Sequence, residues 1–183
     1  MLSVPYNNYI EDPDHRMPKK FISEGAYREA IEAMVIVCVD VVPFDRYRKV
    51  VYLAKRKHKP AMGWWWIGGR ISAGEGAEEA ACRIVKRETS LDVITKRFSL
   101  LSINRYFWKE REQIPQDVGS DNIGYIFTVE LTQKELQQAS QGLDTEEYDR
   151  MSGLQEFDRD RLMRERAHGA ILDLYDLLFP LAP

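Results

Sequence analysis

The hydrophobic and polar positions of this chain predict strands and helices that interleave along its length. The run MVIVCVDVV (34–42) is apolar and β-branched apart from Asp40, which is typical of a strand buried on both faces. Apolar residues at helical spacing recur over 23–32 and 77–89. Further strands are predicted at 49–56, 63–70, 92–103 and 122–131, and further helices at 133–139 and 158–179. Because the strands are short and one helix separates the middle pair, we expect an α/β (α+β) fold with a mixed β-sheet sandwiched between α-helices.

The strand predicted at 63–70 carries three consecutive tryptophans. On a regular strand, Trp65 would point away from the face that holds Trp64 and Trp66. We expect most of this aromatic surface to be core or subunit contact, and it suggests a homodimer.

Length and composition indicate a single domain. A chain of 183 residues that is 44% hydrophobic and 30% charged can bury one substantial core. Residues 1–22 are rich in proline and polar side chains, so we expect them to form an irregular N-terminal arm. Residues 23–183 are then expected to form one domain.

The charge balance and the apolar runs limit the classes of partner. Lys and Arg total 26 against 29 Asp and Glu, a formal net charge of −3, so nucleic acid is not an expected partner. No run approaches the roughly 20 apolar residues of a membrane span, and the N-terminus has no apolar signal-peptide core. Cys38 and Cys82 show no metal-ligand or redox spacing, and we expect buried thiols. These features predict a soluble cytoplasmic protein without a membrane partner.

The stretch GGRISAGEGAEEAACRIVKRETSL (68–91) carries the chemistry of the chain. Two glycines at the end of a strand let the backbone turn sharply and expose a carbonyl to a hard cation. Side chains three and four residues apart on the following helix share one face, so carboxylates there can point towards that carbonyl. Such an arrangement can hold Mg²⁺ against a diphosphate.

This stretch resembles the Nudix box, a glycine and a glutamate followed by the series R-E-U-x-E-E-x-G-U, in which U is a bulky aliphatic residue. Three positions depart from it, because Ile84 and Arg87 replace glutamates and Ser90 replaces the last glycine. One helix glutamate of three is left, so we expect this helix to hold at most one metal ion. The positions that match are Gly69, Glu75, Arg83, Val85, Glu88 and Leu91, and a pair between Glu75 and Arg83 is expected to hold the shape of the loop and helix.

In lacking the first two glutamates and keeping the last, this chain resembles a subgroup of the Nudix family, the GDP-mannose mannosyl hydrolases. Members of that subgroup cleave at the sugar carbon. The likeness extends over about 23–150, since 53–70 resembles the subgroup's basic turn and double glycine, and 119–131 its G-T-D segment. It implies a Mg²⁺-dependent hydrolase, with Mn²⁺ as an alternative ion. The implied substrate is a nucleoside diphosphate-linked small molecule, above all a nucleotide sugar such as GDP-mannose.

Carried over position by position, the resemblance implies a set of site residues. The Gly68 carbonyl and the Glu88 side chain would bind the metal, and Asp144, where the subgroup has a metal-binding glutamine, could supply a further carboxylate ligand. Arg56 and Arg70 would contact the diphosphate, for which guanidinium groups are well suited. Glu88 and Arg70 are accordingly the expected catalytic residues.

Asp40 and the general base need separate treatment. Asp40 falls where the subgroup carries an aspartate, so it is expected to bind near the nucleotide or the arginines, with a purely structural ion pair as the alternative. The subgroup draws its base from a Gln-His pair, but this chain has Asp144 and Thr145 there, and a threonine cannot act as a base. The replacement base would come from Glu146, Glu147, Asp121, His15, His58 or His168.

Three hypotheses follow. The first is a nucleotide-sugar hydrolase, and the second is a Nudix pyrophosphohydrolase that cuts another nucleoside diphosphate derivative at phosphorus. The third is a catalytically silent Nudix module that binds a nucleotide or a protein partner. An acidic side chain near both Glu88 and Asp144 would favour an enzyme, whereas an Arg87 guanidinium in the metal position would favour the silent module.

Overall fold

The computed structural model describes residues 9, 14, 17 and 20–180, and the remaining residues lie outside this description. The predicted arm over 1–22 falls largely on those remaining residues and stays a prediction. Within the described part of the chain, no helix is long and apolar enough to cross a membrane. Cys38 and Cys82 are both free, and each is half-buried rather than fully buried.

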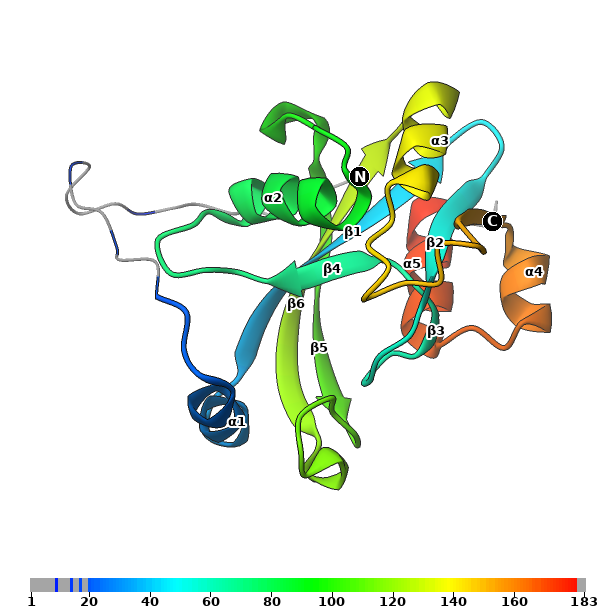
Figure 1. The fold of residues 1–183 in the computed structure, drawn as a ribbon. Coiled ribbons are helices and arrows are strands. Elements are labelled where there is room, and N and C mark those ends of the chain that lie inside the picture. Colours follow the sequence, from blue (N-terminus) through cyan, green and yellow to red (C-terminus); the bar gives the residue numbers. More distant parts are fainter. Residues whose placement is uncertain (1–8, 10–13, 15–16, 18–19, 181–183) are drawn as a thin grey trace.

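A single mixed sheet forms the centre of the molecule (Figure 1). Its strand order is β3-β2-β1-β6-β5, with β4 paired to β1 and β7 paired to β2. Among the described strands, β1 and β6 run parallel and the other pairs run antiparallel, which confirms the mixed sheet. The strands are β1 (Ile36–Asp45), β2 (Val50–Arg56), β3 (Gly63–Trp65), β4 (Ile67–Arg70), β5 (Ser99–Trp108), β6 (Ser120–Glu130) and β7 (Leu154–Phe157).

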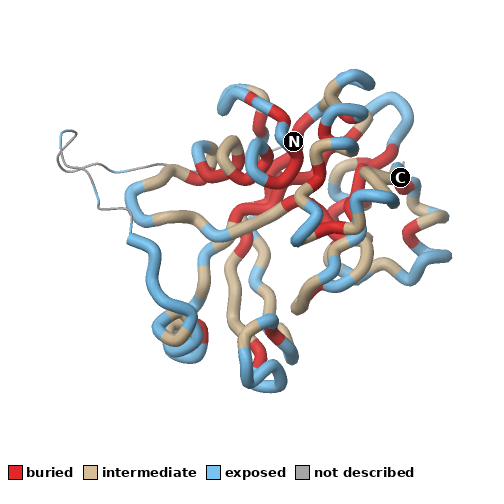
Figure 2. Tube along the Cα trace, viewed as in Figure 1, coloured by how far each residue is buried: buried red, intermediate tan, exposed pale blue. Residues whose placement is uncertain are grey.

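Helices cover both faces of this sheet, as predicted. One cluster of buried side chains packs α2 and α3 on one face, and a second packs α4 and α5 on the other. The buried positions along the chain are red in Figure 2. The helix α2 coincides with the predicted 77–89, and Ser23 caps α1 by accepting a hydrogen bond from the Ala26 N–H at 3.2 Å. The helices are α1 (Glu24–Ala33), α2 (Ala77–Thr89), α3 (Gln133–Gln141), α4 (Arg159–Arg164) and α5 (Gly169–Leu178), with short 3-10 turns η1 (Thr95–Arg97) and η2 (Gln116–Val118).

The aromatic strand predicted at 63–70 is two strands. The chain changes partner at Trp66, so that β3 pairs with β2 and β4 pairs with β1. Trp65 and Trp66 therefore belong to the same buried cluster, with ring centroids 4.3 Å apart. The predicted alternation of faces is wrong because it assumed an unbroken strand.

Two other boundaries differ from the sequence prediction. The strand predicted at 92–103 begins only at Ser99 and continues to Trp108. The helix predicted at 158–179 is interrupted between α4 and α5, where Arg166 adopts a positive φ of 53° that no α-helix accommodates. The short strand β7 was not predicted, since four residues give little alternation to detect.

Candidate active site

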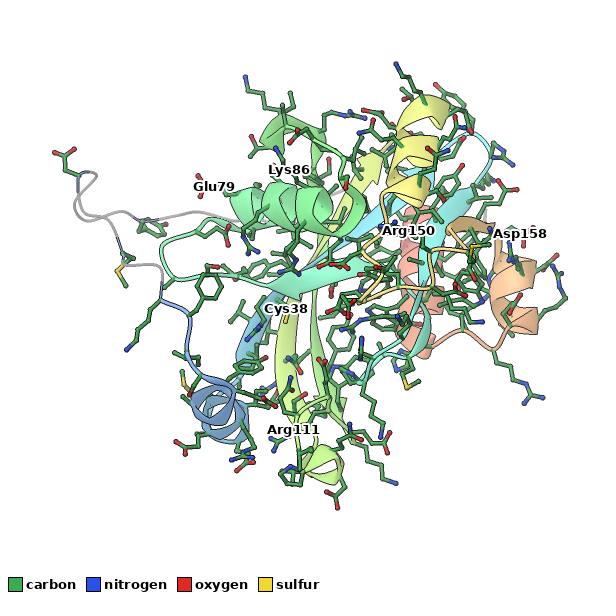
Figure 3. The ribbon with its side chains drawn as sticks, viewed as in Figure 1. Cys38, Glu79, Lys86, Arg111, Arg150 and Asp158 are labelled. Atoms are coloured by element: carbon green, nitrogen blue, oxygen red, sulfur yellow. The ribbon has the colours of Figure 1, made fainter. Side chains whose placement is uncertain are left out.

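A groove of about 1750 Å³ crosses the sheet where β1, β4 and β6 lie side by side. Residues of α1, α2 and the loop between β5 and β6 also line it. Cys38 on β1 and Arg111 in the β5–β6 loop both line this groove, and Figure 3 shows where they lie. Four residues predicted for the site line this groove, namely Asp40, Arg56, Gly68 and Arg70.

The box loop is held by the predicted pair of Glu75 and Arg83. The Arg83 guanidinium donates to both Glu75 carboxylate oxygens at 2.6 and 2.7 Å, and the Ser72 N–H donates to the same carboxylate at 3.0 Å. Arg83 also donates to the Arg70 carbonyl at 2.9 Å. The pair therefore fixes the backbone that presents Arg70 to the groove.

Glu88 is a buried carboxylate with one oxygen unpartnered. Its side chain is 1% exposed, and Oε1 accepts from Nε of Arg87 at 2.7 Å and also from Nη2. Oε2 is buried and has no hydrogen-bond partner among the described residues. Burial raises the pKa of Glu88, the Arg87 charge lowers it, and Glu147 and Asp144 raise it further. A partnerless buried carboxylate oxygen is the kind of group that a cation would satisfy.

Backbone contacts bring Asp144 to Glu88. The Asp144 N–H donates to the Glu88 carbonyl at 2.8 Å, and the Asp144 carbonyl accepts from the Tyr148 N–H at 2.9 Å. The Asp144 carboxylate accepts from the Glu146 N–H at 2.9 Å, within its own turn. The loop after α3 is thus fastened to the end of α2.

Tyr148 lies at the centre of this arrangement and was missed by sequence reasoning. It is 2% exposed, and its backbone forms an isolated antiparallel β-bridge with Arg56 of β2. Burial raises the pKa of Tyr148, as do the negative charges of Glu88 and then Glu147, while the Arg56 charge and the Gly68 N–H lower it. Its only sequence signal was one aromatic residue inside an acidic loop.

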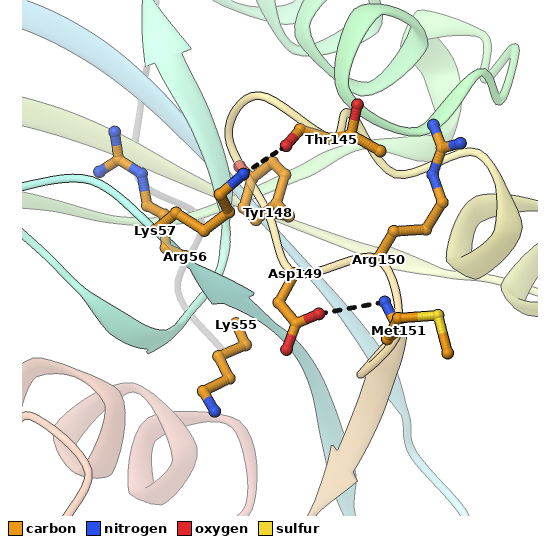
Figure 4. Close-up of a pocket in the computed structure, with 8 residues that line it drawn as sticks. All are labelled: Lys55, Arg56, Lys57, Thr145, Tyr148, Asp149, Arg150 and Met151. Atoms are coloured by element: carbon orange, nitrogen blue, oxygen red, sulfur yellow. Dashed lines mark hydrogen bonds between the residues drawn. The ribbon is translucent and has the colours of Figure 1, made fainter.

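A hollow on β2 shows how the loop is anchored (Figure 4). The Lys57 ammonium donates to the Thr145 carbonyl at 2.6 Å, and the Lys57 N–H donates to the Glu147 carbonyl at 2.9 Å. Arg150 donates to the Leu143 carbonyl at 2.7 Å. These contacts hold the acidic loop against the strand that carries Arg56.

Asp40 occupies space that two glycines leave open. A Cβ at Gly68 would collide with one Asp40 carboxylate oxygen, and a Cβ at Gly124 would lie 2.8 Å from the other. Asp40 is 8% exposed, and this burial raises its pKa to about 7 against the opposing effects of the Trp66 indole and the Arg56 charge. The Trp66 Nε1 has no hydrogen-bond partner among the described residues, so it acts on Asp40 as a nearby dipole.

The two predicted phosphate arginines make different contacts. Arg56 is 22% exposed and lies 3.6 Å from the Glu147 carboxylate. The Arg70 guanidinium stacks 3.9 Å from the ring centroid of Tyr27 on α1. Among the ion pairs of the described residues neither arginine pairs with Asp40, so the structural ion pair offered as an alternative is not formed.

The carboxylates offered as a base differ in their positions. Arg105 donates to both oxygens of Asp121 at 3.1 and 2.7 Å, and this pairing lowers the Asp121 pKa, which makes it a poor base. Glu146 is exposed, whereas Glu147 lines the groove.

The histidines offered as a base are engaged elsewhere or not described. His58 contacts the Glu146 carbonyl at 2.7 Å. His168 caps α5 and packs against Trp65 and Trp108. His15 lies outside the described residues.

The donors around Glu88 fit one divalent ion at most. In the part of the chain that the structure describes, no group of three His, Cys, Asp or Glu side chains gathers at metal-binding distance. The unpartnered Oε2 of Glu88 and the adjoining Asp144 are oxygen donors of the kind Mg²⁺ prefers. Arg87, however, already holds the other Glu88 oxygen.

Comparison with known proteins gives the family. The NUDIX domain family matches residues 34–177, and no match was found among curated proteins. A MutT NUDIX hydrolase from Burkholderia pseudomallei is 19% identical, with 69% of this chain and 85% of that chain covered and a TM-score of 0.54. The E. coli dihydroneopterin triphosphate pyrophosphohydrolase is 18% identical, with 76% of this chain and 92% of that chain covered and a TM-score of 0.53. A MutT protein from Methanosarcina mazei is 13% identical, with 79% of this chain and 92% of that chain covered and a TM-score of 0.56.

At these sequence identities the similarity to solved structures shows the fold alone. Membership of the family is shown by the match to the NUDIX domain over 34–177. The finer likeness to GDP-mannose mannosyl hydrolases stays a prediction. The chain belongs to the NUDIX domain family, and its Nudix box is degenerate.

Proposed function

We propose that this chain is a Mg²⁺-dependent hydrolase of a nucleoside diphosphate-linked small molecule, specifically a nucleotide sugar such as GDP-mannose. The observation that carries the proposal is the buried, half-partnered Glu88 carboxylate beside a groove that holds Arg56, Arg70 and Asp40. Glu88 and Asp144 do not line the groove themselves, but Arg87, which contacts Glu88, does.

The metal would be held by the Gly68 carbonyl, the Glu88 carboxylate and Asp144. A bound Mg²⁺ or Mn²⁺ supplies neutralisation of diphosphate charge and polarisation of a water. Asp144 is tied to Glu88 by a backbone hydrogen bond, and its negative charge acts on the Glu88 carboxylate.

Arg56 and Arg70 would bind the diphosphate. Guanidinium groups give paired hydrogen bonds to phosphate oxygens, and both arginines line the groove. The contact of Arg70 with Tyr27 and the bond from Arg83 to its carbonyl fix its position before a ligand arrives. Such preorganisation lowers the entropic cost of binding.

Glu147 is the carboxylate we assign as general base, and Asp40 is assigned to substrate binding. Glu147 lies 3.6 Å from the Arg56 guanidinium, its charge acts on Glu88, and it lines the groove. A base must reach the proton that it removes, and this is the acidic side chain of the loop that faces the groove. Asp40, with a pKa of about 7, can accept a hydrogen bond from a sugar hydroxyl or a nucleobase N–H.

Two observations favour the other hypotheses. The solved structures of similar fold include a dihydroneopterin triphosphate pyrophosphohydrolase, which supports cleavage at phosphorus as the second candidate. The Arg87 guanidinium on Glu88 supports a silent binding module as the third.

The test is product analysis over a panel of nucleotide sugars that includes GDP-mannose and GDP-glucose, in Mg²⁺ and in chelator. Free sugar with nucleoside diphosphate, formed only with metal, is the expected result. Sugar phosphate with nucleoside monophosphate would move cleavage to phosphorus. No turnover, together with a rise of the melting temperature on adding nucleotide, would replace the enzyme by the binding module.

Variants sharpen this test. Arg70→Gln is expected to raise KM for the diphosphate substrate at least about tenfold, the typical effect of losing a charged hydrogen bond. Arg48→Gln is the matched control, because Arg48 pairs with Glu156 on the surface and does not line the groove. Equal KM values in the two variants would remove Arg70 from the site.

A further inference from the structure

Arg87 stands where the box motif has a glutamate, and its side chain contacts the one helix glutamate that remains. Its guanidinium holds Oε1 of Glu88, and its Nη2 would lie 3.1 Å from a Cβ built on Gly69. The guanidinium therefore stands between the double-glycine turn and the one remaining helix glutamate. Its side chain is 53% exposed, whereas that of Glu88 is 1% exposed.

The charges nearby explain why a cation is held there. Asp144 and Glu147 add to the negative potential at Glu88, and Arg56 lies 3.6 Å from the Glu147 carboxylate. A buried carboxylate in such surroundings is costly without a counter-charge. Arg87 supplies that charge from within the chain.

We propose that Arg87 and a divalent cation compete for the Glu88 carboxylate, so that the ion binds only when the guanidinium swings away into the groove. The inference rests on the metal site of the proposed function. Arg87 lines the groove and is half exposed, so the side chain has space to leave without movement of α2. The apparent metal affinity is then reduced by the fraction of molecules in which Arg87 covers Glu88.

Metal binding to the full chain without substrate tests this competition. Mn²⁺ affinity is measured by electron paramagnetic resonance and Mg²⁺ affinity by calorimetry, for the wild type, Arg87→Gln and Lys86→Gln. Lys86 (labelled on α2 in Figure 3) is the matched control, because it precedes Arg87 in the chain, carries the same charge and pairs with Asp92 on the surface. Removal of a competing charge that close to the carboxylate is expected to tighten binding about tenfold or more, whereas Lys86→Gln should change it less than about twofold.

Three results would overturn the proposal. They are equal affinities in Arg87→Gln and Lys86→Gln, weaker binding in Arg87→Gln than in the wild type, or unchanged metal binding in Glu88→Gln.

If Arg87→Gln folds poorly, the effect of Mg²⁺ on its melting temperature provides a second test. The rise in melting temperature caused by Mg²⁺ should be larger in Arg87→Gln than in the wild type, because the ion then supplies the missing counter-charge. Arg87→Lys keeps the charge with one point of contact and should give an intermediate rise. A rise equal to that of the wild type in both variants contradicts the competition.

The outcome is separable from the proposed function. Tighter metal binding in Arg87→Gln without turnover of any nucleotide sugar would leave the competition standing and remove the hydrolase assignment. Turnover by the wild type with no effect of Arg87 on metal affinity would do the reverse.

Discussion

Replacement of Asp40 by asparagine should make the protein more stable at pH 8 than the wild type. The carboxylate is buried between two glycine positions, and its pKa is raised from 3.8 to about 7. A pKa raised on folding means that the folded state resists ionisation. The stability associated with the neutral form is fully present below pH 3.8 and is lost as the pH rises towards 7.

The size of the effect follows from these two pKa values. The difference between 3.8 and about 7 corresponds to a cost of roughly 4 kcal/mol once the carboxyl is ionised. Asparagine avoids this cost, but its amide N–H₂ would add a buried donor, which costs about 2 kcal/mol if unpaired. A net gain of about 2 kcal/mol at pH 8 is therefore expected.

The pH dependence separates the two contributions, since the amide cost does not titrate. Urea unfolding of the wild type and Asp40→Asn should show a stability difference that grows by about 2.5 kcal/mol between pH 5 and pH 8. Asp176→Asn is the control, because hydrogen bonding to Arg159 lowers the pKa of Asp176, and its difference from the wild type should stay flat over this range. A flat difference for Asp40→Asn would refute the assignment of a desolvated carboxylate.

Three further predictions concern the framework of the site. Arg83→Ala should destabilise the fold by about 3 kcal/mol in urea unfolding, because it removes the guanidinium counter-charge of the 5% exposed Glu75 carboxylate, and a loss below about 0.5 kcal/mol would contradict this. Arg111→Met should speed hydrogen exchange in α1, since the buried Arg111 guanidinium holds Glu32, and unchanged exchange there would show that α1 is held by other contacts. Tyr148→Phe should cost about 1 kcal/mol in thermal or urea unfolding, because the Gly68 N–H loses the hydroxyl oxygen that accepts its hydrogen bond, and a neutral or stabilising effect would argue against that bond.

The parts of the structure that could be predicted from the sequence are those set by short-range residue patterns. The α2 helix and the pairing of Glu75 with Arg83 depend on residues within one loop and the helix after it, so their spacing is sufficient. The mixed sheet followed from the order and length of the apolar runs. The change of partner at Trp66 was not predictable, because it depends on which strands lie on either side.

Tertiary contacts account for the parts that were missed. Tyr148 enters the site because the loop after α3 folds back on β2, which no short-range pattern records. The contact of Arg87 with Glu88 depends on the burial of Glu88 against other elements, and neighbours on a helix do not otherwise face each other. The homodimer stays a prediction.

The central claim is that Glu88 holds the metal for hydrolysis of a nucleoside diphosphate-linked substrate. The most direct measurement is the initial rate of product formation from GDP-mannose and the active members of the panel, for the wild type and Glu88→Gln, with Mg²⁺ titrated and folding checked by circular dichroism. Mg²⁺-dependent turnover is expected in the wild type, with at least about a hundredfold loss in a folded Glu88→Gln. Equal turnover in the two proteins at saturating Mg²⁺ would contradict it.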